Sequence, residues 1–223
     1  MLRHLQTDES YEPLEEATFR NLTKKTLFLV SLATAKRVSE LQGLANMVGF
    51  TNSKAYVQYL PEFIPKTSIL DNPTPRDFKI KAISRAHNNQ PDDLRLCPVR
   101  ALRICLNKVK SQPLCCRNLF VQLNHMDRPM SKNGISYFLR DTIREAHQLQ
   151  PDADYPIGDV SAHSIRAVAT SLNFMKNRSI SAVMEAATWR GNNTFTSFYL
   201  RDVGRVYEHC RALGPIVVGS TVL

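Results

Sequence analysis

The stretch from Asp159 to Asp202 reads DVSAHSIRAVATSLNFMKNRSISAVMEAATWRGNNTFTSFYLRD, and the rest of the chain is best interpreted from it. His163 and Arg166 lie three positions apart, at the start of a predicted helix that Asp159 or Ser161 would cap. Residues three apart on a helix share one face, so both side chains can contact the same small group. A guanidinium beside an imidazole suits a phosphate, because it offers fixed donors next to a titratable proton.

Two aromatic residues follow this pair at intervals that need an explanation. Trp189 comes after a second predicted helix, which Ser179 would cap, and Tyr199 lies ten residues further on, in a short helix predicted to begin at Thr194. Taken singly, each has a structural explanation. His163 could be a hydrogen-bonded core histidine, Trp189 a core residue, and Tyr199 one of the seven tyrosines, on an amphipathic helix.

Composition favours one large domain, or one domain with an extension, and an anionic partner. The chain has 223 residues, 43% of them hydrophobic and 22% charged, which is enough to bury a core and argues against disorder. Lysine and arginine exceed aspartate and glutamate by nine, and nucleic acid is the commonest partner of such a basic domain. The apolar runs are too short for a membrane span, and the first residues lack the apolar core of a signal peptide.

The cysteines and glycines point away from metal or nucleotide cofactors. The five cysteines show no zinc-ligand spacing, and the histidines no HExxH pattern. An odd count without a disulfide framework predicts reduced thiols in an intracellular compartment, most simply as small buried hydrophobes. No Gly-rich phosphate loop is present among the eight glycines. We therefore expect neither a cofactor nor a metal, and no small-molecule substrate.

The first half of the chain predicts helices followed by a small sheet. Residues 1–16 are expected to be a linker or the remnant of a preceding segment, and helical spacing follows over residues 18–32. Lys36 and Arg37 are placed near the junction of two helices. AYVQYL (55–60) and FKIKAI (78–83) predict antiparallel strands, and the proline-rich hairpin between them carries Lys66. A lone lysine there, or an arginine at a helix end, is commonly just solvated.

The second half is predicted to be largely helical. Residues 94–97 are expected to form a short strand, Pro98 to open a helix, and residues 118–123 to be extended. Ser131 is a candidate cap for another helix, on which Arg140 and Arg144 lie four apart. The apolar residues 213–223 could pack on the same chain or on a neighbour. The predicted fold is mainly α with a small antiparallel β-sheet (α+β).

The order of the candidate residues is more informative than any one of them. An arginine in RVSEL, a hairpin lysine, HxxR at a helix start, a tryptophan and a tyrosine follow one another. This ordered set resembles the tyrosine recombinase (phage integrase) family over residues 18–203. RVSEL around Arg37 is similar to the family's first arginine box, and HSIRAVATS to its HxxR box. The wording AKRVSELQGL and TFTSFYLRD is most similar to DIRS-type retroelement recombinases.

This sequence departs from the family pattern in two respects. The interval from Trp189 to Tyr199 is one residue longer than in most phage and bacterial members, where Phe198 would be the counterpart. Phenylalanine cannot act as a nucleophile, so Tyr199 is retained and Tyr207 is the fallback. The sixteen or so leading residues are also too few for the family's N-terminal core-binding domain. The expected organisation is a linker or remnant (1–16), a catalytic domain (17–207) and a tail (208–223).

The resemblance implies cleavage and rejoining of double-stranded DNA in the nucleus, for the integration of a mobile element. Tyr199 would form a 3′-phosphotyrosine link, while Arg37, Arg166 and Trp189 hold the phosphate. Lys66 and His163 would transfer protons, and protomers could assemble as a homo-oligomer on DNA. Two alternatives remain open: a catalytically silent DNA-binding or interaction module, and, less favoured by the box wording, a type IB topoisomerase.

Overall fold

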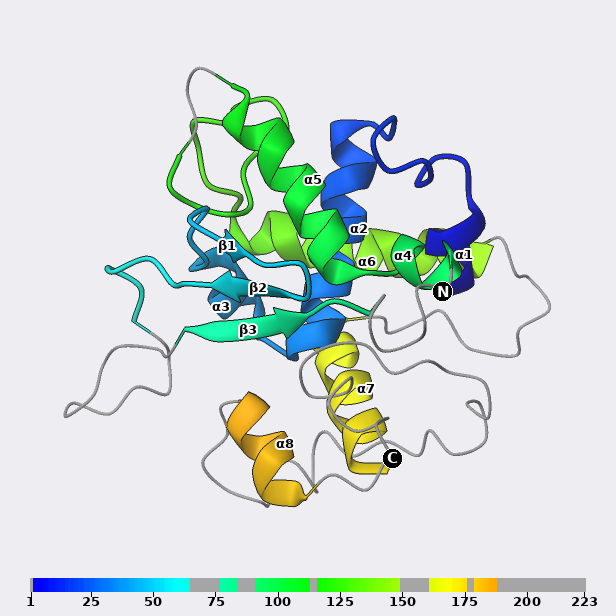
Figure 1. Cartoon of the computed structure of the whole chain (residues 1–223), viewed down its shortest axis with the longest axis vertical. Coiled ribbons are helices and arrows are strands. Elements are labelled where there is room, and N and C mark those ends of the chain that lie inside the picture. Colours follow the sequence, from blue (N-terminus) through cyan, green and yellow to red (C-terminus); the bar gives the residue numbers. More distant parts are fainter. Residues whose placement is uncertain are drawn as a thin grey trace.

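The structure is a computed structural model that describes residues 2–64, 77–83, 91–112, 116–148, 161–175 and 179–187. In this part of the chain, helices surround one long central helix, and a small sheet lies to one side (Figure 1). The elements in order are α1 (Leu2–Thr7), α2 (Phe19–Thr34), α3 (Val38–Gln42), β1 (Gly49–Phe50), β2 (Lys54–Val57), β3 (Phe78–Lys81), α4 (Pro91–Arg95), α5 (Pro98–Lys110), α6 (Lys132–Gln148), α7 (Ala162–Met175) and α8 (Ile180–Ala187). The predicted mainly helical fold with a small antiparallel sheet is confirmed.

Helix α2 is the centre of the packing. Thr18 caps its start by accepting a hydrogen bond from the Asn21 backbone N–H at 3.2 Å. Every residue from Leu22 to Thr34 is buried, because α5, α6 and α7 cover the helix from different sides. A helix that is buried all round is typical of the core of a larger domain. The helix predicted for residues 18–32 is confirmed.

The sheet has three antiparallel strands in the order β1-β2-β3. Ala55 pairs with Ile80, and Val57 with Phe78, so that their side chains face the hydrophobic core. The two predicted strands are confirmed. The two-residue β1 was not predicted, since a pair that short leaves no period in the sequence.

Helices α5 and α6 are confirmed where the sequence placed them. Pro98 occupies the first turn of α5, and the Ser131 hydroxyl accepts from the Gly134 N–H at 3.0 Å at the start of α6. The strand predicted at residues 94–97 is wrong, because residues 91–95 form α4. The extended piece at residues 118–123 is confirmed in part, by isolated bridges at Asn118 and Val121.

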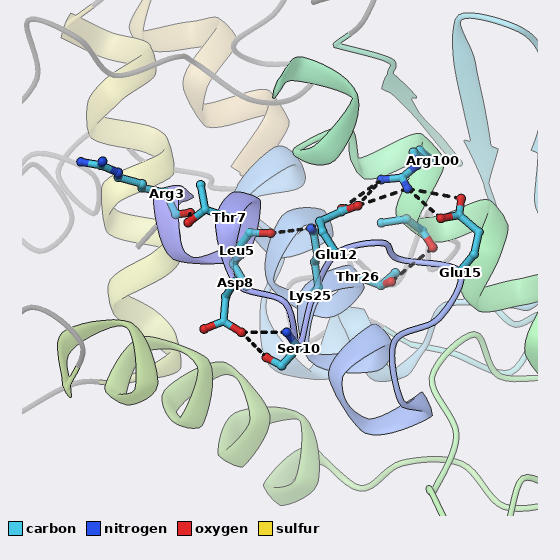
Figure 2. Close-up of polar contacts among 11 residues, drawn as sticks. Arg3, Leu5, Thr7, Asp8, Ser10, Glu12, Glu15, Lys25, Thr26 and Arg100 are labelled. Carbon is cyan, nitrogen blue, oxygen red and sulfur yellow. Dashed lines mark hydrogen bonds and ion pairs between the residues drawn. The ribbon is translucent and has the colours of Figure 1, made fainter. Parts of the chain in front are cut away.

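The leading residues were expected to be a linker or remnant, and their packing contradicts this. Leu5, Tyr11 and Leu14 are at most 1% exposed and belong to the main hydrophobic core. Figure 2 shows the polar contacts that accompany this packing, with Glu12 between Lys25 and Arg100. Residues 2–17 are therefore an integral part of the body. Among the helices that the structure describes, none has the length and apolarity needed to cross a membrane.

Candidate functional site

The candidate site lies at the corner where α2 ends and α3 begins. Ala35 ends α2 in a left-handed conformation with a φ of 51°, and its N–H still donates to the Ser31 carbonyl at 2.9 Å. The chain then turns into α3, whose first residue follows Arg37. The Glu40 carboxylate reaches back to accept from the Arg37 backbone N–H at 2.6 Å, as in a capping box. This contact fixes the corner and holds Glu40 almost fully buried, at 3% exposure.

Arg37 and Arg166 converge at this corner on one carboxylate. Nη1 of Arg37 lies 3.6 Å from Oε1 of Glu40, and Nη1 of Arg166 lies 3.5 Å from Oε2. Arg166 comes from α7, which packs against α2, and its Nη1 also donates to the Ala35 carbonyl at 2.8 Å. Two guanidinium groups facing one carboxylate leave a net positive charge. Such a site favours a further anion.

Arg166 is turned inward in this structure. Arg166 is 2% exposed. In addition to the contacts above, its Nη2 donates to the Ala187 carbonyl at the end of α8. Carbonyl oxygens at helix ends carry partial negative charge, so they are favourable partners for a guanidinium. The Arg37 side chain, in contrast, is 20% exposed.

Lys36 adds a third cation to the corner. Its Nζ lies 5.0 Å from the ring centre of Phe78 and 5.9 Å from that of Tyr59, within the range of cation–π attraction. Burial is the largest influence on this ammonium and lowers its pKa. Glu40 acts against that shift, while Arg166 and Arg37 lower the pKa further. Burial also raises the pKa of the Tyr59 phenol, so Tyr59 stays protonated at neutral pH.

The other predicted site residues fall outside what the structure describes. Lys66, Trp189 and Tyr199 lie outside the described residues, as do Tyr207 and Phe198. His163 lies in the first turn of α7, but its side chain is outside the described part of the chain. The structure thus brings together two of the six predicted site residues, Arg37 and Arg166.

Two residues of this corner were missed by the sequence reasoning. Glu40 stands three residues after Arg37 in RVSEL, and this spacing fits both a capping box and a side-chain ion pair. This spacing could have identified Glu40. No local pattern points to Lys36, because its aromatic partners, Tyr59 and Phe78, are distant from it in sequence.

Comparison with known proteins identifies the fold. No protein-family model matches the chain, and no curated protein matches it. Among solved structures, it is similar to the XerH site-specific recombinase bound to palindromic difH substrate in a post-cleavage complex, with 15% identity over 89% of this chain and a TM-score of 0.59. A lambda integrase dimer bound to a COC′ core site matches 94% of this chain at 14% identity, with a TM-score of 0.49. A lambda integrase tetramer bound to a Holliday junction matches 94% at 18% identity, with a TM-score of 0.47.

The likeness to XerH shows a fold like that of an integrase catalytic domain. This is the fold class that the ordered motifs implied. The chain spans about half the length of the recombinase chains described above, covering 48% of the XerH chain.

Proposed function

We propose that this chain is a DNA strand transferase of the tyrosine recombinase type, which cleaves and rejoins duplex DNA. The observation that carries the proposal is the convergence of Arg37 and Arg166 on Glu40, at a corner of a fold like that of an integrase catalytic domain. Two arginines from opposite ends of the sequence meet there, as phosphate binding by both would require. The XerH structure, of the same fold, is of a post-cleavage complex with its palindromic difH substrate.

In the proposed reaction, Tyr199 attacks a DNA phosphodiester and forms a 3′-phosphotyrosine bond, and the 5′ oxygen leaves. A phenol with an ordinary pKa of about 10 is a weak nucleophile, so the negative charge that develops must be neutralised. Arg37 and Arg166 would neutralise it on the nonbridging oxygens, and Trp189 would donate from its indole N–H. The reverse attack by a 5′ hydroxyl then rejoins the strand without an external energy source.

Proton transfer is assigned to two further residues. Lys66 would protonate the departing 5′ oxygen, and His163 would assist at the tyrosine or hold the phosphate. Because positive charge and proton donors come from side chains, we expect no metal or cofactor requirement. We further propose a catalytic domain that extends to residue 207 and includes residues 2–16, which pack in the main core, with a tail at 208–223. The proposal extends to a DIRS-type retroelement origin, a nuclear location and a homo-oligomer on DNA.

A nicked duplex that traps the covalent intermediate tests the proposal directly. We expect the wild-type chain to form a protein–DNA adduct that resists denaturation, and the Tyr199→Phe variant to form none. Tyr207→Phe is the matched control and should retain the adduct. If Tyr207→Phe alone abolishes it, the nucleophile is reassigned, and if the wild-type chain forms no adduct, the proposed activity is wrong.

The Arg166→Ala variant separates catalysis from binding. A residue that stabilises charge in the transition state typically contributes about 100-fold to 1,000-fold in rate. We expect a loss of cleavage of at least about that size, with little change in the affinity for non-specific duplex. Equal losses in both quantities would contradict the assigned role.

A catalytically silent DNA-binding module is the second candidate, and one observation favours it. Arg166 is buried and donates to the backbone carbonyls of Ala35 and Ala187, which suits a structural arginine. A chain that binds duplex in a filter assay but forms no adduct on the nicked substrate would support this module over the enzyme.

A further inference from the structure

The two faces of the small sheet differ sharply in chemistry. Successive residues of a strand point to opposite faces. Ala55, Val57 and Ile80 point inward and are fully buried in the core. The opposite side, called here the outer sheet face, consists of Lys54, Tyr56, Gln58, Asp77, Lys79 and Lys81.

Two lysines of the outer sheet face stand directly opposite each other. Lys54 on β2 is paired in register with Lys81 on β3. Like charges in directly opposite positions destabilise a strand pair. None of the described carboxylates forms an ion pair with either lysine, or with Lys79. An anion bound between the two strands would remove this repulsion.

The next pair along the strands holds a lysine on an aromatic ring. Tyr56 lies opposite Lys79, and the Lys79 Nζ is 5.4 Å from the centre of the Tyr56 ring. Tyr56 is 38% exposed. The ring restricts the ammonium before any ligand arrives, so less conformational entropy is lost when an anion binds.

Asp77, the one described acid of the outer sheet face, lies at one end of this face and accepts a hydrogen bond from a neighbour. The Asp77 carboxylate accepts from the Gln58 amide at 3.3 Å, so the described outer sheet face has three positive charges and one negative. The end with Lys54 and Lys81 is entirely basic. The candidate site adjoins the other face of the sheet, where the ring of Phe78, the first residue of β3, lies beside the Lys36 ammonium.

We propose that the outer sheet face binds the phosphate backbone of duplex DNA. The choice of DNA as occupant rests on the proposed function and on the charge pattern. Lys54 lies on β2 and Lys79 and Lys81 lie on β3, with same-face side chains about 6.6 Å apart along each strand. The three lysines thus place positive charge on both strands of this face. Such a surface provides phosphate contacts that position a duplex and carry no base readout.

Salt-dependent binding tests the surface independently of cleavage. The probe is a random-sequence 30-base-pair duplex, titrated by fluorescence anisotropy between about 50 and 200 mM KCl. Each lost phosphate contact reduces the slope of log affinity against log salt by about 1. We expect the combined Lys54→Gln, Lys79→Gln and Lys81→Gln variant to lose about 2 to 3 from this slope and at least about tenfold in affinity at 50 mM KCl.

Two control variants isolate position from total charge. The combined Lys110→Gln, Arg128→Gln and Lys132→Gln variant removes as many charges elsewhere and should change the slope by less than about 1. The combined Lys54→Arg, Lys79→Arg and Lys81→Arg variant should keep the wild-type slope. The proposal is overturned if the outer-face and control variants lose equally, if the outer-face variant binds like the wild type, or if the wild type binds no duplex at 50 mM KCl.

Two further outcomes separate this proposal from others. If the outer-face variant keeps its DNA affinity but loses affinity for poly-glutamate, the surface binds an acidic protein segment and the proposal is wrong. The nicked-duplex assay of the wild type reports separately on catalysis. A wild type without an adduct but with a sheet-dependent salt slope refutes the proposed reaction and supports the surface. If the wild type forms an adduct and the outer-face variant keeps the wild-type slope, the proposed reaction is supported and the proposed surface is refuted.

Discussion

At the scale of single residues, the most consequential charge is that of Glu40. Its carboxylate lies between Arg37 and Arg166 and is almost fully buried. We expect Glu40→Gln to lower the free energy of unfolding by about 3 kcal/mol, because it leaves two guanidinium groups without their shared counter-charge. Urea unfolding followed by circular dichroism measures this loss.

Glu62→Gln is the matched control for Glu40→Gln. Glu62 also pairs with an arginine, Arg117, at 2.7 Å, but both side chains are more than half exposed. Exposed pairs contribute little, so the control should change the free energy of unfolding by less than about 1 kcal/mol. Similar losses in the two variants would show that Glu40 is not the counter-charge that holds the corner.

The buried ammonium of Lys36 leads to a prediction about how the free energy of unfolding depends on pH. Burial lowers the pKa of its ammonium in the folded chain below that of an unfolded lysine. As the pH rises through the folded-state pKa, the folded chain releases this proton first, and the unfolded chain then binds more protons. The free energy of unfolding of the wild type should therefore rise relative to that of Lys36→Met between about pH 7 and pH 10. A difference that stays constant over this range would contradict the prediction.

The sequence could predict the arginines of the site but not their surroundings. Arg37 and Arg166 stand in local motifs with recognisable wording, whereas the Lys36 contacts depend on how Tyr59 and Phe78 are brought together by strand pairing. The same limit applies to the inward orientation of Arg166. It depends on the Ala35 and Ala187 carbonyls, which end two different helices.

At the scale of elements, the segment before α2 is held by buried charge. The Lys25 side chain on α2 is fully buried, and its Nζ donates to Glu12 at 2.6 Å and to the Leu5 carbonyl at 2.5 Å (Figure 2). Glu12 also pairs with Arg100 on α5 at 3.0 Å. One carboxylate thus ties residues 2–17 to two helices.

Glu12→Gln should lower the free energy of unfolding by about 3 kcal/mol, because the buried Lys25 ammonium loses its counter-charge. Glu15→Gln is the control. Glu15 pairs with the same Arg100 at 3.0 Å, but its side chain is 60% exposed, and we expect a change below about 1 kcal/mol. Both values come from urea unfolding. If Glu15→Gln loses as much as Glu12→Gln, the stabilisation comes from Arg100, which both carboxylates contact, and not from the buried Lys25.

Local patterns predicted the long elements better than the short ones. Helices α2, α5 and α6 follow from periodic apolar residues and, for α5 and α6, from Pro98 and the Ser131 cap. The strand expected at residues 94–97 failed because so short a run carries no period, and α4 forms there instead. The linker assigned to residues 1–16 failed because Glu12 there pairs with the buried Lys25, a pairing that composition does not reveal.

At the scale of the whole molecule, the N-terminal segment is part of the cooperative unit. Leu5, Tyr11 and Leu14 are all buried, and each large apolar side chain contributes about 1.5 kcal/mol or more on burial. A chain that starts at residue 17 should therefore lose at least about 4 kcal/mol in urea unfolding, or fail to unfold cooperatively. A truncated chain as stable as the full chain would restore the linker assignment.

The overall fold was predictable because its evidence is distributed along the chain. The order of an RVSEL box, a hairpin lysine and an HxxR box constrains the topology, and the likeness to XerH agrees with that reading at 15% identity. The packing around α2 was harder to predict from the sequence. Lys24 and Lys25 would be expected to face solvent, but both are fully buried in the fold.

The contact between Arg166 and the last carbonyl of α8 makes this arginine a poor target for conservative replacement. Its guanidinium spans two helix ends at once, and one lysine nitrogen has neither the breadth nor the planar geometry to do so.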